Sequence, residues 1–134
     1  MGDGLIRFLG YRVRPIERIR PAEKMTIDLF WQAQRRPDKD YTVFVHLLGG
    51  YNPATGGPVW AQDDRQPLAG GHPTTRWLPG QTVADRHDLV LPKEIPPGTY
   101  TVEIGLYDAS NGARLGVAGS DQDRILIGEI QIIP

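Results

Sequence analysis

A chain of 134 residues, 40% of them hydrophobic and 23% charged, has the composition of one globular domain, which excludes a disordered or fibrous protein. The formal net charge is −1, and acidic and basic residues are mixed along the chain, so we expect no nucleic-acid partner. No apolar run approaches the ~20 residues of a membrane-spanning helix, so we expect no direct insertion of this segment into a membrane. The absence of Cys excludes disulfides, thiolate catalysis and zinc sites with Cys ligands.

Alternation of hydrophobic and polar residues predicts β-strands along the whole chain, and 16 Gly and 12 Pro predict many turns between them. The expected strands, in chain order, are 5–13, 24–33, 41–48, 58–63, 82–91, 99–108 and 125–133. The segments 24–33 and 99–108 alternate most strictly, and 41–48 carries hydrophobic side chains on both faces. We therefore expect an all-β fold, a two-sheet antiparallel immunoglobulin-like sandwich of about seven to nine strands.

The two strictly alternating strands predict one shared core. Its expected members are Met25, Ile27, Leu29, Trp31, Tyr100, Val102, Ile104 and Leu106.

One short segment near the N-terminus is rich in basic residues. It contains Arg12, Arg14, Arg18 and Arg20. Because Pro15 and Glu17 interrupt this cluster, we interpret it as the solvated edge of a strand and the loop that follows.

The segment 96–102 resembles the turn and penultimate strand of immunoglobulin-like and fibronectin-like domains, since Pro96-Pro97-Gly98 precedes Thr99-Tyr100-Thr101-Val102. The resemblance implies that Tyr100 bonds through its hydroxyl to backbone upstream, as in a tyrosine corner.

A longer series of signatures spans most of the chain. It comprises Leu29-Phe30-Trp31-Gln32-Ala33, 41–47, 63–67, Pro73-Thr74, Trp77-Leu78-Pro79-Gly80, and 97–100 followed by 105–108. Their order resembles the extracytoplasmic C-terminal domains of bacterial multi-spanning membrane glycosyltransferases. The resemblance implies one accessory domain over 1–134, excised from a longer chain and located at the cell surface or in the periplasm. It also implies that the other domains of that parent polypeptide are partners.

The connection 51–77 is the densest group of aromatic, acidic and basic side chains among Gly and Pro. The candidate ligand-binding residues are Trp60, Asp63, Asp64, Arg65, His72 and Trp77. Indole rings offer flat platforms for sugars, and charged side chains offer hydroxyl partners, so a glycan is the expected ligand. The same residues also suit a structural plug in which Trp77 closes the end of the sandwich and Trp60 packs on a strand.

Catalytic motifs are missing from the sequence, and we expect no enzyme, no cofactor and no metal. The spacing of His46, His72 and His87 does not match a metal site, and His46 is expected to be a hydrogen-bonded core residue. The expected function is a non-catalytic accessory domain, structural or weakly carbohydrate-binding.

Two alternatives stay open. One is a small free-standing hydrolase with carboxylates in the 51–88 region, in which Asp63 or Asp64 works with Asp85 or Asp88. The other is a protein-interaction module that uses an exposed sheet edge or the face around Tyr107.

Overall fold

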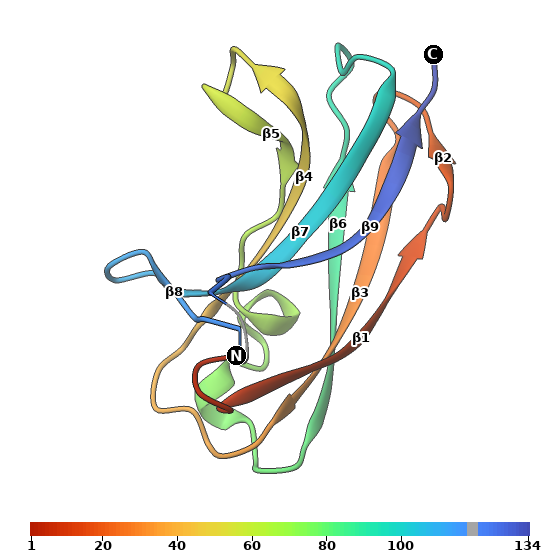
Figure 1. Cartoon of the computed structure of the whole chain (residues 1–134). Coiled ribbons are helices and arrows are strands. Elements are labelled where there is room, and N and C mark those ends of the chain that lie inside the picture. The colour runs from red at the N-terminus through yellow and green to blue at the C-terminus, as the bar shows by residue number, and fades with distance from the viewer. Residues whose placement is uncertain (118–120) are drawn as a thin grey trace.

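The computed structural model describes residues 1–117 and 121–134, which form nine strands and two short 3-10 helices (Figure 1). The strands are β1 (Ile6–Arg14), β2 (Arg18–Ile19), β3 (Lys24–Ala33), β4 (Thr42–Asn52), β5 (Gly57–Gln62), β6 (Thr82–Val90), β7 (Gly98–Asp108), β8 (Ala113–Arg114) and β9 (Ile125–Ile132). The helices are η1 (Pro67–Gly70) and η2 (Thr74–Arg76). The expectation of an all-β chain is therefore confirmed.

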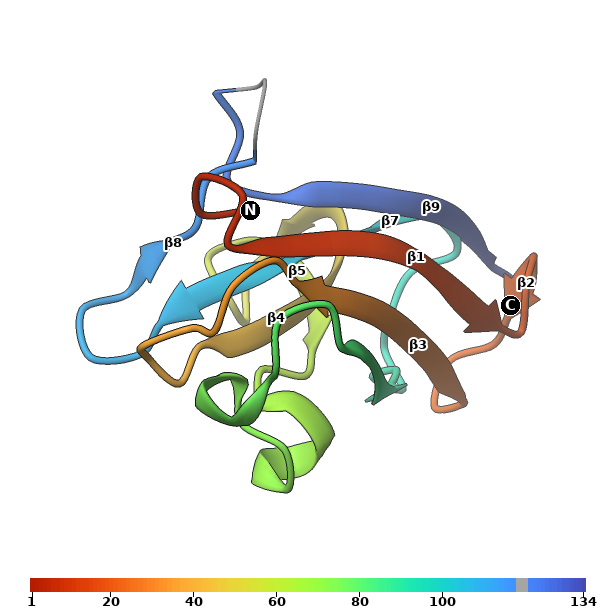
Figure 2. The same ribbon diagram turned by 90° about the horizontal axis from the view of Figure 1, so that it is seen from below.

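Two sheets build the domain. One has the order β1-β3-β6, and the other has the order β2-β9-β7-β4-β5, with β8 paired to β7. Neighbouring strands are antiparallel except β2 and β9, which are parallel. Figure 2 shows β1 of the first sheet running beside β9 of the second.

The hydrophobic core lies between the inner faces of these sheets. All eight residues expected there from the alternation of β3 and β7 are buried, from 0% exposure at Trp31 to 4% at Tyr100, so that prediction is confirmed. Strand β4 is covered on both faces, as its sequence predicts, because Val43, Val45 and Leu47 face the core while Phe44 is buried on the other side.

A β-bulge in β1 changes which side chains face outward. Phe8 pairs with Trp31 and Gly10 pairs with Phe30, so Leu9 has no partner of its own on β3. An extra residue reverses the alternation of a strand. Arg7 before the bulge and Arg12 and Arg14 after it therefore lie on the same outer face of the sheet.

Much of the connection 51–77 is regular, since the strand expected over 58–63 is present as β5. Strand β4 continues to Asn52, and a tight turn returns the chain into β5. The Asn52 side chain holds this turn by donating to the carbonyl of Val59 (2.9 Å) and accepting from the amide of Ala54 (3.0 Å). Gly56 adopts φ +70°, which a side chain would disfavour. Apart from the turn 53–56, the residues outside the strands are 63–77, and η1 and η2 occupy about half of that segment.

Candidate functional site

The structure separates the six residues predicted to bind a ligand. Trp77 is fully buried and donates its indole N–H to the carbonyl of His72 (2.9 Å). Trp60 is half-buried, donates to the carbonyl of Gly50 (2.8 Å) and meets the ring of Tyr100 edge-on. Trp77 therefore offers no exposed platform and Trp60 packs on Tyr100, as the alternative of a structural plug expects, while ligand binding in this connection stays a prediction. His72 has a buried Nε2 without a hydrogen-bond partner among the described residues.

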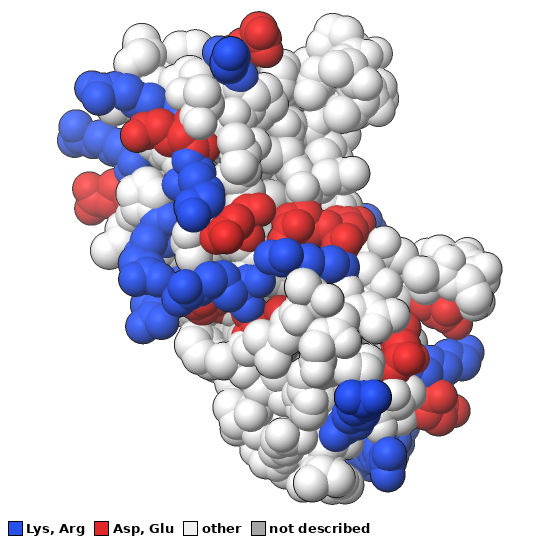
Figure 3. Space-filling model, turned by 180° about the vertical axis from the view of Figure 1, so that it is seen from behind, with Lys and Arg blue, Asp and Glu red and all other residues white. Residues whose placement is uncertain are grey.

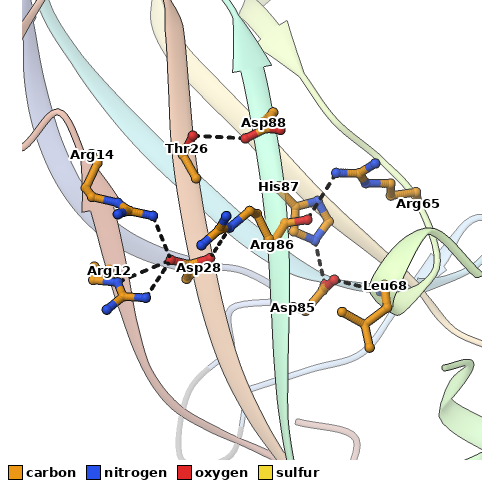
Figure 4. A network of polar contacts seen from close by, with 10 residues as sticks. All are labelled: Arg12, Arg14, Thr26, Asp28, Arg65, Leu68, Asp85, Arg86, His87 and Asp88. Atoms are coloured by element: carbon orange, nitrogen blue, oxygen red, sulfur yellow. Dashed lines mark hydrogen bonds and ion pairs between the residues drawn. The ribbon is translucent and has the colours of Figure 1, made fainter. Parts of the chain in front are cut away.

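Asp63 and Arg65 belong to one polar cluster, centred on the fully buried His87 of β6. The Nδ1 atom of His87 lies 2.9 Å from Asp63, and its Nε2 lies 2.6 Å from Asp85, which is also fully buried. Asp85 in addition accepts the backbone N–H of Leu68 at the start of η1 (2.9 Å), as Figure 4 shows. Arg65 lies 3.0 Å from Asp63 without hydrogen-bond geometry.

Asp64 belongs to a second cluster, on the outer face of the larger sheet around His46 of β4. The Nδ1 atom of His46 lies 2.9 Å from Glu103, and its Nε2 lies 3.0 Å from Asp64. Arg124 donates to Glu103 (3.1 Å), and the guanidinium of Arg114 lies 4.1 Å from the centre of the Phe44 ring. A shallow pocket of about 230 Å³ lies beside this cluster, and it is lined by Phe44, His46, Asp64, Tyr107, Gly112 and Arg114.

In His46 and in His87, each ring nitrogen lies within hydrogen-bond distance of a carboxylate. An ionised carboxylate only accepts hydrogen bonds, so where both neighbouring carboxyl groups are ionised each ring nitrogen donates and the ring is an imidazolium. Burial lowers the pKa of His87, but the bonds and charges of Asp85 and Asp63 outweigh it and raise the pKa overall. The pKa of His46 is raised in the same way, against burial, by Asp64 and Glu103. A ring in this state can give a proton but cannot take one.

The predicted hydrolytic pairs do not face a common cleft. Asp85 is fully buried behind His87, whereas Asp88 lies on the opposite face of β6, where it accepts a hydrogen bond from Thr26 (2.9 Å). Asp63 and Asp64 point to different histidines. The reason is the alternation of β6, which sends residues 85 and 87 inward and residues 86 and 88 outward.

A third polar group lies on the outer face of the three-stranded sheet, where sequence reasoning places only a solvated edge. Three arginines converge there on Asp28 of β3, and we call them the arginine triad: Arg12, Arg14 and Arg86 (Figure 4). Asp28 is 6% exposed, so the arginines cover it. Asp28 has two cross-strand partners, Arg12 on β1 and Arg86 on β6, which flank β3 on opposite sides. Only the strand order brings these two arginines together at Asp28.

Neither metal chemistry nor membrane insertion gains support. Among residues 1–117 and 121–134, no group of three or more His, Asp or Glu side chains is arranged to hold a metal ion, so the absence of a metal stays a prediction. No described helix is long and apolar enough to span a bilayer.

The comparisons with known proteins add one result. No protein-family model matches the chain, and no curated protein matches its sequence. Among solved structures, the chain is similar to the Pseudomonas fluorescens alkylpurine DNA glycosylase AlkC, bound to DNA that contains an abasic site analog. The TM-score is 0.56 at 15% identity, and the match covers 96% of this chain but only 30% of the glycosylase. At this identity the likeness shows a shared fold.

This likeness corrects the functional expectations from the sequence. The fold that covers almost the whole chain also forms part of a DNA-repair enzyme, whereas the sequence predicts a non-catalytic accessory domain and no enzyme. It forms part of a protein that binds DNA, whereas the sequence predicts no nucleic-acid partner. The two alternatives, a small hydrolase and a protein-interaction module, gain no support from it. Overall charge is a weak basis for predicting a partner, because it averages over faces that differ in charge.

Proposed function

We propose that this chain acts in a DNA-processing enzyme and contacts duplex DNA there. The observation that carries the proposal is the fold shared over 96% of this chain with part of a DNA glycosylase that was captured on DNA. Because the chain spans 30% of that protein, the base-excision activity of the whole glycosylase is not transferred to it.

The charge of one face supports DNA contact. The outer face of the three-stranded sheet presents five cations, Arg7, Arg12, Arg14, Lys24 and Arg86, against two carboxylates, Asp28 and Asp88. The chain as a whole has a net charge of −1, so its excess of acid lies on other surfaces. Figure 3, seen from behind the view of Figure 1, shows Lys and Arg gathered in a band with acidic side chains set between them. Such a face attracts phosphates through charge that is independent of base sequence.

We propose in addition that the two sheets have the immunoglobulin-like arrangement. The hydroxyl of Tyr100 donates to the carbonyl of Pro96 at 2.8 Å, which is the contact that a tyrosine corner makes, and it supports this arrangement.

The resemblance to glycosyltransferase domains and the extracytoplasmic location stay predictions. They compete with the proposal, since a domain outside the membrane is separated from the DNA of its own cell. DNA binding by the isolated chain therefore favours one interpretation over the other.

Fluorescence anisotropy with a labelled DNA duplex tests the proposal. We expect binding at low salt with a Kd of about 10⁻⁵ M, and a log–log plot of affinity against salt that falls with a slope of roughly −0.9 for each phosphate contacted. A duplex with an abasic site analog, run in parallel, reports any preference for damaged DNA. No binding at low salt with protein at about 10⁻⁴ M would contradict the proposal.

A further inference from the structure

We propose that the arginine triad around Asp28 is a phosphate-binding site and that its ligand is the phosphodiester of a DNA strand. This inference rests on the proposed function and assigns to it a particular surface and a particular chemical group.

The geometry leaves the arginines oriented and only partly used. Asp28 accepts from Nε and Nη2 of Arg12 (3.2 and 3.1 Å) and from Nε of Arg86 (2.8 Å), and Nη2 of Arg14 lies 3.7 Å away. A guanidinium carries five N–H donors, so one carboxylate engages a minority of them. The three arginine side chains are 54–59% exposed, which puts their remaining donors within reach of a ligand.

The charges at this point do not balance. Three guanidinium groups surround one carboxylate, which leaves an excess of two positive charges around Asp28. Asp88 lies two residues after Arg86 on the same face of β6, and its negative charge, which acts on Arg86, offsets part of this excess. Hydrogen bonding to the covered Asp28 accounts for Arg12 and Arg86, but Arg14 lies 3.7 Å away, and contacts made by arginines that are more than half exposed contribute little to stability, so a structural role does not account for the third cation. A planar guanidinium group with unused N–H donors can form paired hydrogen bonds with the oxygens of a phosphate.

Asp28 acts as a positioning residue in this arrangement. The hydrogen bond from Arg86 lowers the pKa of Asp28, and Arg12 adds to this effect, although burial opposes it. The carboxylate therefore stays ionised at neutral pH and holds guanidinium groups from two different strands over one spot.

The bulge of β1 completes the surface. If β1 alternated regularly through Leu9 without a bulge, Arg7 would lie on the face opposite Arg12 and Arg14. With the bulge, Arg7, Arg12 and Arg14 of the edge strand β1 share the outer face. Arg7 is therefore a further cation along β1 beyond the triad. A DNA backbone presents phosphates at regular intervals, and a row of cations along one sheet face can contact more than one of them.

The test compares two double variants that change the charge equally. Arg12→Gln with Arg86→Gln removes two members of the triad, and Arg35→Gln with Arg76→Gln removes two exposed arginines elsewhere on the chain. For the triad variant we expect about 10-fold weaker binding to a DNA duplex and a salt slope shallower by about 1 for each phosphate that the variant no longer binds. For the control variant we expect affinity within about two-fold of the parent chain.

Circular dichroism checks that both variants fold. If the triad variant does not, Arg14→Gln replaces it, because Arg14 makes the longest contact with Asp28 and its removal disturbs the sheet least. Equal decreases in affinity for the triad and control variants would mean that only bulk charge matters, and they would overturn the site. Unchanged affinity in the triad variant would overturn it as well.

A titration with inorganic phosphate separates this inference from the proposed function. Amide and guanidinium NMR signals of Arg12 and Arg86 should shift on addition of phosphate, and the same signals of Arg35 and Arg76 should not. If phosphate shifts the triad while the chain binds no DNA, the phosphodiester ligand and the proposed function are both wrong, and a free phosphate is the ligand. If DNA binds but phosphate causes no shift at the triad, the site is wrong and the proposed function stands.

Discussion

At the scale of the residue, the main electrostatic feature is two histidines, His46 and His87, each of which contacts a carboxylate through both ring nitrogens. His87 and Asp85 are fully buried, so their charges interact with each other and with Asp63 instead of with water. Separation of such a pair leaves an unpaired buried charge, which is far more costly than separation of an exposed pair. The two imidazolium groups therefore tie the stability of the fold to pH.

Raising the pH should destabilise the chain. The pKa of His46 and that of His87 are raised in the folded state, against burial, by their carboxylates, so their contribution is complete below the unfolded pKa of 6.5 and is lost as the pH rises through the folded pKa. We expect the urea midpoint to fall between about pH 6 and pH 9.

The control for this prediction is His46→Gln, which should reduce the pH dependence of the midpoint. The comparison is needed because the N-terminal amine, whose pKa burial lowers, titrates with the opposite sign in the same range. A midpoint with the same dependence on pH in both chains would contradict the assignment of His46 as an imidazolium.

The hydroxyl of Tyr100 provides a second prediction at this scale. Tyr100→Phe removes the bond to the carbonyl of Pro96 and should lower the free energy of unfolding by about 1 kcal/mol. Tyr51→Phe is the matched control, since Tyr51 is 70% exposed and should change stability by less than about 0.5 kcal/mol. Equal effects in urea denaturation would show that the corner contributes nothing.

At the scale of the element, strands β4 and β7 approach closely where Phe44 lies over Gly105. A Cβ atom on Gly105 would overlap the ring of Phe44, and it would also lie 3.2 Å from the carbonyl of Asp123. Phe44 cannot move away freely, because the Arg114 guanidinium covers its ring and His46 packs beside it. The glycine is therefore required by space and not by backbone conformation.

Gly105→Ala should therefore destabilise the chain by about 1–3 kcal/mol through overpacking. Gly50→Ala is the control on β4, where an added Cβ meets nothing within 4 Å, and it should be neutral or slightly stabilising. Denaturant midpoints of the two variants measure the difference. If the Gly105 variant matches the parent chain, the packing described around Phe44 is incorrect.

The alternation of hydrophobic and polar residues predicts the strands of this chain well, but it does not predict which side chains of different strands contact each other. The seven long strands follow from period-two patterns, and β3 is predicted to the residue. Nothing local to the sequence places His46 beside Glu103 or Arg12 and Arg86 beside Asp28, because those contacts depend on strand order and register. The bulge at Leu9 has no clear sequence signal either, although Gly10 marks a place where a bulge is common. Sequence density in 51–77 made Asp63 and Asp64 candidate ligand-binding residues, and nothing local to the sequence places them beside His87 of β6 and His46 of β4.

At the scale of the whole molecule, charge is distributed by face. A net charge of −1 hides an outer sheet face on which cations outnumber carboxylates by five to two. Steering by such a face depends on local potential and falls with salt, so overall charge is a poor guide to a DNA partner. The fold shared with part of a DNA glycosylase and the charge of this face support the same proposal.

The most direct measurement of DNA contact is an NMR titration of the isotope-labelled chain with a short duplex. We expect backbone and arginine signals of β1, β3 and β6 to shift together, at residues whose side chains face outward, and added salt to reverse the shifts. Signals of the His46 pocket on the other sheet should stay in place. Shifts confined to the larger sheet, or no shifts at low salt, would contradict the claim that this domain contacts DNA through its three-stranded sheet.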